Sequence, residues 1–187
     1  MPPESIIVKL DIGCGPNKQP GFVGCDLIKF ENVDYVFNAG RDKWPFPDNS
    51  VDEIYSAHFL EHLTNLGGAF ERVWFFNEAY RVLKENCKLQ VIFPHWASNR
   101  YYGDPTHKEP FSEMGFSYLD KEWRKNQAPH TDSEFFNRGY SCNFKSTYGY
   151  NLDPALNFRN EEFKMFAAKY YKEACTDIIG TCVKVTA

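Results

Sequence analysis

The sequence lacks the features that mark membrane-bound and secreted proteins. No apolar run approaches the roughly 20 residues that a membrane span needs, and the first residues contain neither a basic stretch nor a hydrophobic run of signal-peptide length. Six cysteines are present, but none forms a C-x-x-C pair and their spacing is irregular. We therefore expect a cytoplasmic protein with reduced cysteines and no membrane partner.

The chain also lacks an excess of positive charge. Its formal net charge is −4, whereas proteins that capture nucleic acid broadly use a basic surface to displace counterions. With 43% hydrophobic and 25% charged residues, the composition excludes disordered chains, coiled coils and collagen. A length of 187 residues suits one globular domain, residues 1–187, that is not expected to bind nucleic acid.

The first half of the chain alternates between strand and helix patterns. Short β-branched segments predict strands, and a helical period with one broad apolar face predicts a helix over about 65–85. Asn86 is a candidate helix end. The predicted strands cover 5–12, 22–27, 33–37, 51–56 and 88–93. A strand, a helix and a strand in this order form a right-handed parallel unit, so we expect an α/β protein with an open, Rossmann-like, mostly parallel sheet and flanking helices.

The second half is rich in aromatic residues. Residues 96–150 contain 13 aromatic residues among 55 and show little periodicity. We interpret them as an insertion after the fifth strand, built of loops and short helices. A helix over 160–173 and a strand over 178–185 are expected to follow. The expected parts are thus a cofactor-binding part (5–95), an insertion or lid (96–150) and a C-terminal helix and strand (151–187).

The connection between the first two strands is too short for a helix. It has about nine residues, whereas a parallel crossover normally needs a dozen or more. One face of the sheet should therefore be bare near the first strand. We expect aromatic side chains from elsewhere, or a second subunit in a homodimer, to cover it.

Four groups of residues should meet at the carboxyl ends of the strands, where open α/β sheets bind ligands. Asp11-Ile12-Gly13-Cys14-Gly15 leaves the first strand, and its glycines allow a ligand to approach main-chain N–H groups. Asp26 closes the second strand, and a carboxylate there can accept hydrogen bonds from both hydroxyls of a ribose. Asn38 follows the third strand and His58 the fourth.

Three segments of the chain, LDIGCGPNKQPGFVGCDL, WPFPDNSVDEIYSAHFLEHL and EAYRVLKENCKLQVIFPH, resemble the class I S-adenosylmethionine-dependent methyltransferases. The similarity is to small, type 11-like members that lack the first helix. It covers roughly residues 8 to 95, with the segments in the family's order. It implies a transferase with S-adenosylmethionine as its cofactor. The longer G-x-G-x-x-G turn that cradles a pyrophosphate is absent, which argues against NAD.

The resemblance assigns roles to the residues at the strand ends. Asp11, Gly13 and Gly15 would line the methionine end of the cofactor, Asp26 would bind the ribose, and Asn38 stands where the family often has an aspartate beside the adenine. His58 would lie close to both the cofactor and the methyl acceptor. The cofactor-binding set that we expect is Asp11, Gly13, Cys14, Gly15, Asp26, Leu27, Asn38, Ala39 and His58.

The segment from Pro94 to Lys108 follows the fifth strand and ends in Asp-Pro-Thr-His-Lys. Family members often carry a similar string, which implies a substrate or cofactor lid; a well-packed loop is the alternative. The substrate-binding residues that we expect from it are Trp96, Arg100, Tyr101, Tyr102, Asp104 and His107. His58, His95 and His107 are the candidate catalytic bases, since imidazole titrates near neutral pH.

Two metal sites are alternatives to this interpretation. His58-Phe59-Leu60-Glu61-His62 matches the H-x-x-E-H pattern of inverted zinc peptidases. Because it adjoins a strand end, we expect Glu61 and His62 instead to cap and orient the start of the following helix or to brace the cofactor loop. His95, Asp104 and His107 form the other candidate. We expect no metal.

The leading functional hypothesis is methyl transfer to an oxygen or nitrogen of a small or medium-sized polar acceptor. A module that binds S-adenosylmethionine or S-adenosylhomocysteine without transferring a methyl group is the first alternative. A nucleic-acid methyltransferase is the second. The absence of an N/D-P-P-[YFW] tetrapeptide after the fourth strand and of a Pro-Cys nucleophile pair argues against it.

Overall fold

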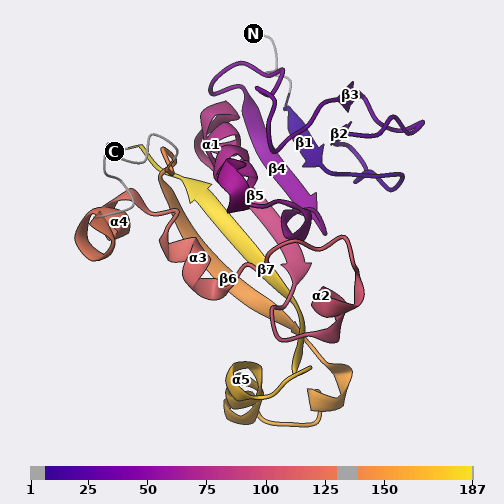
Figure 1. The fold of residues 1–187 in the computed structure, drawn as a ribbon, viewed down its shortest axis with the longest axis vertical. Helices are drawn as coiled ribbons and strands as arrows, with labels where there is room; N and C mark the ends of the chain where they lie inside the picture. The colour runs from indigo at the N-terminus through magenta and orange to yellow at the C-terminus, as the bar shows by residue number, and fades with distance from the viewer. Residues whose placement is uncertain (1–6, 130–138, 187) are drawn as a thin grey trace, which may run out of the picture.

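The chain forms a seven-stranded sheet in the order β3-β2-β1-β4-β5-β7-β6 (Figure 1). The computed structural model describes residues 7–129 and 139–186. Strands β1 to β5 are parallel to one another, while β7 runs antiparallel to both β5 and β6. The strands are β1 (Lys9–Ile12), β2 (Val23–Asp26), β3 (Tyr35–Val36), β4 (Val51–Ala57), β5 (Leu83–Pro94), β6 (Phe144–Leu152) and β7 (Cys175–Lys184). The predicted open, mostly parallel α/β sheet is confirmed.

Helix α1 (Glu71–Val82) covers one face of this sheet (Figure 1). Its Phe75 and Phe76 are fully buried, and Trp44 packs edge-on against Phe75. The inward side chains of the central strands, such as Ile54 and Leu89, complete the core. Because side chains alternate along a strand, only one face of each strand contributes to this core.

The helix is shorter than predicted at both ends. Two 3-10 turns, η1 (Leu60–His62) and η2 (Leu66–Gly68), precede it, and Phe70 in the left-handed conformation (φ 52°) marks its start. It ends at Val82, where β5 begins at once. Asn86 does adopt a left-handed conformation (φ 60°), but within an irregular stretch of β5 rather than at a helix end. The sequence therefore predicted correctly that the chain turns at Asn86, but this turn lies within β5 and does not end a helix.

The insertion after β5 contains three short helices and continues into a strand that the sequence did not predict. The helices are α2 (Asn99–Gly103), α3 (Glu113–Ser117) and α4 (Lys121–Gln127). The missed strand is β6, whose burial pattern is mostly exposed and intermediate. It is an edge strand, so its outward residues stay polar and it lacks the apolar run that identified the others.

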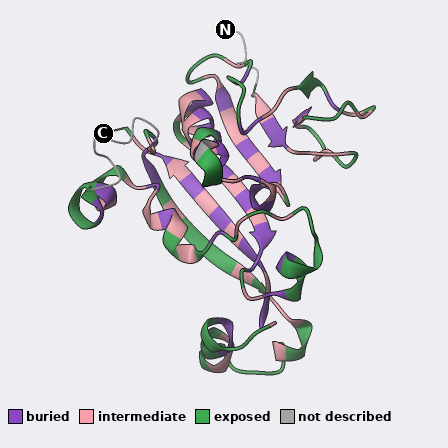
Figure 2. Cartoon of the chain, viewed as in Figure 1, coloured by how far each residue is buried: buried purple, intermediate pink, exposed green. Residues whose placement is uncertain are grey.

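The aromatic insertion packs on the same face as α1. Phe111 lies 5.5 Å from Phe93 and 5.8 Å from Phe76, measured between ring centroids, and Phe116 packs against Phe93. Phe93, Phe111 and Phe116 therefore lie on the face that carries α1, whereas Phe22 is an aromatic side chain that packs on the bare face, against Tyr55. Buried strands and exposed outer elements are shown in Figure 2.

The opposite face carries charge instead. No helix lies between β1 and β2, all of whose connecting residues the structure describes. Glu53 on β4 pairs with Lys9 on β1 at 2.8 Å and with Lys88 on β5 at 3.0 Å. Phe22 packs against Tyr55, with 6.3 Å between ring centroids. A row of ion pairs can face water, so this face requires neither a helix nor a second subunit.

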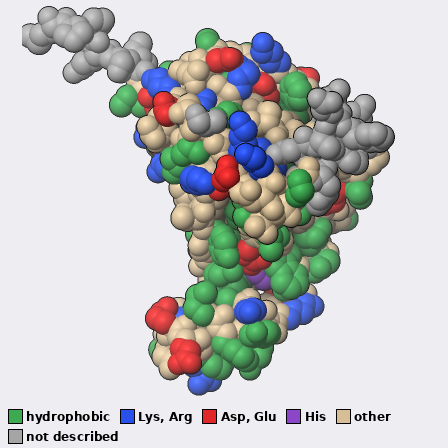
Figure 3. Space-filling view, turned by 90° about the vertical axis from the view of Figure 1, so that its left-hand side faces the viewer, with side chains coloured by type: hydrophobic (Ala, Val, Ile, Leu, Met, Phe, Trp, Pro, Cys, Tyr) green, Lys and Arg blue, Asp and Glu red, His purple; other side chains and the backbone are tan. Residues whose placement is uncertain are grey.

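The segment between β6 and β7 forms a lobe beyond the carboxyl end of β5. It contains η5 (Pro154–Leu156) and α5 (Glu161–Tyr170). Figure 3 shows this lobe set off from the rest of the molecule, with hydrophobic side chains on its surface and along the waist that joins it. Among the described residues, no helix has the length and apolar character needed to span a bilayer.

Candidate functional site at the carboxyl edge of the sheet

A cleft with about 510 Å³ of empty space opens between the ends of β1 and β2, the loop after β3 and the turn after β4. It is largely apolar, with a few polar groups at its edges. Its lining residues are Gly13, Asp26, Leu27, Phe37, Asn38, Ala39, Phe59, His62, Leu63, Glu71 and Lys108. Five of these belong to the predicted cofactor-binding set, and the cleft lies at the predicted edge of the sheet.

The glycine turn after β1 contributes space rather than hydrogen-bond donors. Gly13 N and Cys14 N both donate to Cys25 O, at 2.8 and 3.2 Å, and Gly15 N donates to Asp26 Oδ2 at 2.8 Å. The three N–H groups that sequence reasoning offered to a ligand are thus taken by β2. Gly13 and Gly15 have φ of +72° and +52°, and nothing lies within 4 Å of the position that a Cβ on Gly15 would occupy.

Asp26 faces this turn from the end of β2. Its Oδ2 accepts from Gly15 N at 2.8 Å, and its Oδ1 accepts from Ile28 N at 2.9 Å. A carboxylate offers about four lone-pair sites, so two remain after these bonds. They suffice for the two hydroxyls of a ribose. The backbone bonds hold the carboxylate at the lip of the cleft, and this geometry fits the nucleoside part of S-adenosylmethionine.

The other end of the cleft, where the sequence predicts the adenine, is formed by the loop after β3. Asn38 and Ala39 line it together with Phe37. Asn38 Oδ1 accepts from Gly40 N at 3.0 Å, so one of its two lone pairs is already used. A flat apolar ring can lie against Phe37 and Ala39, while the free amide hydrogens of an asparagine can donate to a ring nitrogen.

A network of ion pairs closes this end. The buried Glu71 accepts from Arg41 Nε at 2.7 Å and from Lys108 Nζ at 3.2 Å. Burial tends to raise the pKa of Glu71, but its hydrogen bonds with Thr64, Arg41 and Lys108 outweigh that effect and the pKa is lowered. The network ties the Asp-Pro-Thr-His-Lys loop to the start of α1 across the cleft.

Two members of the predicted set lie behind the cleft. Asp11 is buried, and its Oδ2 accepts from Gln19 N at 2.8 Å. Burial raises the pKa of Asp11. Burial, aided by Asp11 and Asp26, also raises the pKa of the Cys14 thiol to about 11, so it stays protonated at neutral pH. Both residues brace the turn in this structure.

His58 occupies the position predicted for it, directly after β4. Its φ is +53°, and its side chain is 44% exposed. Its Nδ1 lies 3.5 Å from Oε1 of the buried Glu61. The nearby carboxylate of Glu61 raises the pKa of His58, although burial opposes this. An exposed imidazole held by a buried carboxylate is suited to accepting a proton.

His95 has different surroundings from those expected of a catalytic base. It is buried, and its Nδ1 accepts from Ala97 N at 3.1 Å. Its Nε2 lies 3.3 Å from Glu113 Oε1, which also accepts from Tyr150 OH at 3.1 Å. Both ring nitrogens therefore face protein groups, and His95 ties the end of β5 to α3 and β6.

The predicted substrate-binding residues are divided between two places. Trp96 and Tyr102 line a second, wider groove with α5, which has about 740 Å³ of empty space. The α5 side of this groove is formed by Ala168, Lys169, Tyr170, Tyr171 and Lys172. Arg100 pairs with Asp177 at 3.2 Å, which links α2 to β7.

Of the other three, Tyr101 belongs to α2, and Asp104 and His107 lie in the loop before Lys108. Tyr101 is buried, and its carbonyl oxygen lies 2.6 Å from His107 Nδ1. Asp104 Oδ1 accepts from Thr106 N at 2.8 Å. Lys108 N in turn donates to Glu61 O at 2.9 Å. The loop thus folds back onto η1, and His107 comes to lie beside Glu61.

Sequence reasoning missed the half of the cleft that comes from distant segments. Phe37, Phe59, His62, Leu63, Glu71 and Lys108 were not in the predicted set. Phe59 and Leu63 follow β4 and look like ordinary core residues. Two of the six carried a signal, because His62 ends the H-x-x-E-H pattern and Lys108 ends the Asp-Pro-Thr-His-Lys string.

Comparison with known proteins finds similarity to methyltransferases. Residues 23–91 match the family model described as a methyltransferase domain. The sterol 24-C-methyltransferase of Pneumocystis carinii (strain B80) is 31% identical over 124 residues, which cover 54% of this chain. The matched part spans only 31% of that curated relative's length.

Solved structures share the fold at low sequence identity. A SAM-dependent methyltransferase from Archaeoglobus fulgidus has a TM-score of 0.62 and 18% identity, over 96% of this chain and 87% of that one. The geranyl diphosphate C-methyltransferase from Streptomyces coelicolor A3(2), in complex with Mg²⁺, geranyl diphosphate and S-adenosyl-L-homocysteine, has a TM-score of 0.54 and 14% identity. That match covers 97% of this chain and 73% of the other.

Proposed function

We propose that this chain, which belongs to the class I S-adenosylmethionine-dependent methyltransferase family, transfers a methyl group from S-adenosylmethionine to a small-molecule acceptor. The cofactor would lie in the cleft beside the Gly13–Gly15 turn, with its ribose on Asp26 and its adenine between Phe37 and Ala39. The cleft is formed within one chain, so the proposal does not need a second subunit.

One observation carries this proposal. Asp26 is anchored by two backbone N–H groups at the lip of a cleft, and it keeps two acceptor sites. The same carboxylate lies inside the segment that matches the methyltransferase family model. A carboxylate fixed at the end of β2, next to an open glycine turn, is suited to a ribose diol.

The chain's own residues position the acceptor and handle its proton. When bound, S-adenosylmethionine supplies an electrophilic methyl group on a sulfonium. The protein's task is to hold the acceptor atom in line with that methyl group, which contributes about 7–11 kcal/mol in well-oriented systems. His58 is the base in this proposal, because it is exposed beside the cleft and oriented by Glu61.

We propose an oxygen or nitrogen as the acceptor atom. His58, His62, Asp104 and His107 lie at this edge of the sheet, and such side chains suit an acceptor that must lose a proton. A carbon acceptor is the second candidate, favoured by the name of the curated relative, a sterol C-methyltransferase, and by the aromatic groove of Trp96, Tyr102 and α5.

Isothermal calorimetry with S-adenosylhomocysteine tests the cofactor site. Asp26→Asn keeps the size of the side chain but removes its charge. Hydrogen bonds to a charged group contribute about 1.5–3 kcal/mol each, so we expect affinity to fall on the order of 100-fold. Asp26→Ala should lower it further.

Glu31→Gln, an exposed carboxylate in the loop after β2, is the matched control and should bind normally. Thermal unfolding of each variant without ligand shows whether the fold survives, since Asp26 also holds Gly15 and Ile28. Undiminished affinity of a folded Asp26→Asn variant would remove the ribose assignment and the proposal that depends on it.

The acceptor atom is tested separately with S-adenosylmethionine labelled with ¹³C in its methyl group. Candidate acceptors carrying hydroxyl, amine or activated carbon positions are incubated with the enzyme, and the ¹³C chemical shift of the product separates O-, N- and C-methyl groups. An O- or N-methyl product is expected, and a C-methyl product would favour the second candidate. If the cofactor binds but no acceptor yields S-adenosylhomocysteine, the chain is a binding module instead.

A further inference from the structure

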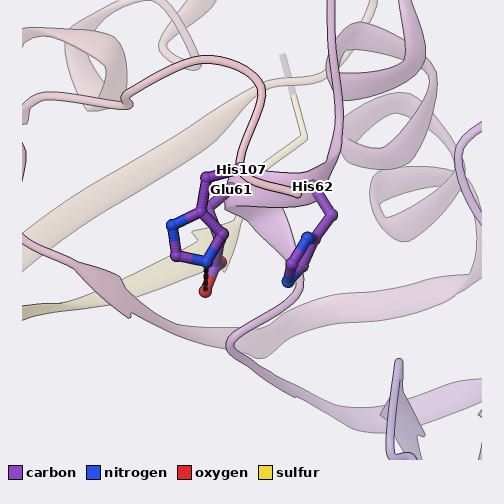
Figure 4. Close-up of side chains that lie close together, drawn as sticks. All are labelled: Glu61, His62 and His107. Carbon is purple, nitrogen blue, oxygen red and sulfur yellow. Dashed lines mark ion pairs between the residues drawn. The ribbon is translucent and has the colours of Figure 1, made fainter. Parts of the chain in front are cut away.

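Glu61, His62 and His107 come together at the edge of the cofactor cleft, although His107 is distant in sequence from the other two (Figure 4). Glu61 and His62 belong to η1, the turn after β4. His107 comes from the loop that follows α2, and the bond from Lys108 N to Glu61 O holds that loop against η1. One ligand atom from each of the three side chains lies within 4.8 Å of the other two.

The buried carboxylate of Glu61 is unsatisfied. Its side chain is 2% exposed, and neither of its oxygens has a hydrogen-bond partner among the described residues. The nearest cationic candidates are His58 Nδ1 at 3.5 Å and His107 Nε2 at 3.9 Å from Oε1. Burying an unpaired carboxylate is costly, so a group that compensates its charge is expected here.

The tautomer of His107 directs a lone pair at this carboxylate. His107 Nδ1 lies 2.6 Å from the carbonyl oxygen of Tyr101, and a carbonyl can only accept, so Nδ1 carries the hydrogen. In the neutral ring Nε2 then has a lone pair that faces the oxygens of Glu61. Two electron-rich atoms face each other across 3.9 Å, a gap too wide for a hydrogen bond but suited to a bridging cation.

His62 is held in a similar way. Its Nδ1 lies 3.2 Å from Thr106 Oγ1 and 3.4 Å from Thr106 O. When Nδ1 donates to these oxygens, Nε2 is left as the ligating atom. Hydrogen bonds from the second ring nitrogen to a carbonyl or hydroxyl are the usual outer partners of metal-binding histidines.

The three side chains favour a particular class of metal. Two imidazoles and one carboxylate suit Zn²⁺ and similar divalent ions, whereas Mg²⁺ and Ca²⁺ prefer all-oxygen sites. Zinc binds these groups at about 2.0–2.2 Å, so ligand atoms within 4.8 Å of one another need to close in only slightly. Three protein ligands also leave a coordination position open.

We propose that Glu61, His62 and His107 bind a divalent metal ion of the zinc class at the rim of the cofactor cleft. The H-x-x-E-H motif thus supplies two ligands from a 3-10 turn, and the Asp-Pro-Thr-His-Lys loop supplies the third. His62 also lines the cofactor cleft, so the open coordination position lies near the proposed transfer site. Metal binding itself does not depend on the proposed methyl transfer.

Titration of the metal-free full chain with Co²⁺ tests the site, because cobalt in a low-coordinate nitrogen and oxygen site absorbs visibly. We expect one Co²⁺ per chain, displaced by Zn²⁺. Glu61→Gln, His62→Asn and His107→Asn should each weaken binding by at least about 100-fold, more than typical outer-partner losses. Glu113→Gln alters a second histidine–carboxylate pair, His95 and Glu113, and should leave cobalt affinity unchanged.

Thermal unfolding with and without Zn²⁺ provides the second readout. Zn²⁺ should stabilise the wild type and Glu113→Gln but not the three ligand variants, provided that circular dichroism shows them folded. A protonated His107 that simply pairs with Glu61 would give no cobalt spectrum, and thiolate charge-transfer bands would place the ion on cysteines. Either result overturns the proposal. Both readouts omit cofactor and acceptor, so they are independent of the outcome for methyl transfer.

Discussion

Two carboxylates show how the same residue type acquires different roles from its neighbours. Asp26 is held by two backbone N–H groups at an open cleft and keeps free acceptor sites. Glu113 accepts from Tyr150 OH at 3.1 Å and from Trp96 Nε1 at 3.3 Å, and its Oε1 lies 3.3 Å from His95 Nε2. The first arrangement leaves room for a ligand, whereas the second joins the end of β5 to α3 and β6.

The surroundings of Glu113 make the stability of the fold depend on pH. Burial opposes ionisation, but the interactions with His95 and Tyr150 outweigh it and lower the pKa of Glu113 from 4.5 to about 2. A carboxyl whose pKa is lower in the folded chain stabilises the fold above about pH 4.5 and loses that contribution as the pH falls toward 2.

Replacing Glu113 with Gln should therefore lower the free energy of unfolding by about 1–3 kcal/mol at pH 7. The difference from the wild type should shrink between pH 5 and pH 3. Urea unfolding at pH 7, 5 and 3 measures it, with the exposed Glu162→Gln as the control. A difference that stays constant over this range would contradict the assigned interaction.

At the scale of the elements, loops and short turns form much of the site. Residues 60–62 form a 3-10 turn rather than the helix that the zinc-peptidase pattern requires. In a helix, residues i and i+4 share one face, but here His58 lies outside the turn and His107 takes part in its place. These residues therefore lack the helical geometry of the zinc-peptidase pattern, and in the proposed metal site His107 takes the place of His58.

Helix α5 has little support from the core. It belongs to the lobe between β6 and β7 (Figure 3), and only Ala167 and Ala168 are buried on it. Its N-cap is Asn160, whose Oδ1 accepts from Phe163 N at 2.9 Å. The helix lines the aromatic groove, so its local stability sets how well that groove is formed.

Asn160→Ala should destabilise α5 by about 1 kcal/mol. Because 1 kcal/mol corresponds to a factor of about five, amide exchange over 161–170 should become about fivefold faster. Hydrogen-exchange mass spectrometry measures this, with Asn157→Ala, an exposed asparagine outside the helix, as the control. Equal acceleration in the strands β4 and β5 would show that the lobe does not unfold separately.

At the scale of the whole molecule, the two faces of the sheet differ. Packed helices and aromatic side chains cover one face, and charged strand residues lie on the other. Helix α1 and the aromatic insertion share the first face. The Lys9–Glu53–Lys88 row lies on the second. The connection after β1 can therefore lack a helix, because the charged strand residues on that face can be exposed to water.

A thermal shift measures whether the cofactor cleft prefers S-adenosylhomocysteine to other nucleotides. S-Adenosylhomocysteine at 100 times its dissociation constant should stabilise the fold by about 2.7 kcal/mol. For a chain of this size that corresponds to a rise in Tm of about 5–10 °C. NAD and ATP should give no shift, because the N–H groups of the glycine turn are bonded to β2 and none is free to hold a phosphate. A comparable shift with NAD would show that the cleft accepts dinucleotides.

The sequence by itself determined the sheet, the missing first helix and the edge at which the cleft lies. These follow from local information, namely apolar runs, the Gly13–Gly15 turn, and Asp26 at a strand end. Only the tertiary structure decided which face the aromatic residues cover, that β6 forms the edge of the sheet, and that His107 meets Glu61. Those outcomes depend on contacts between segments distant in sequence, and no local pattern of residues encodes the distance between them.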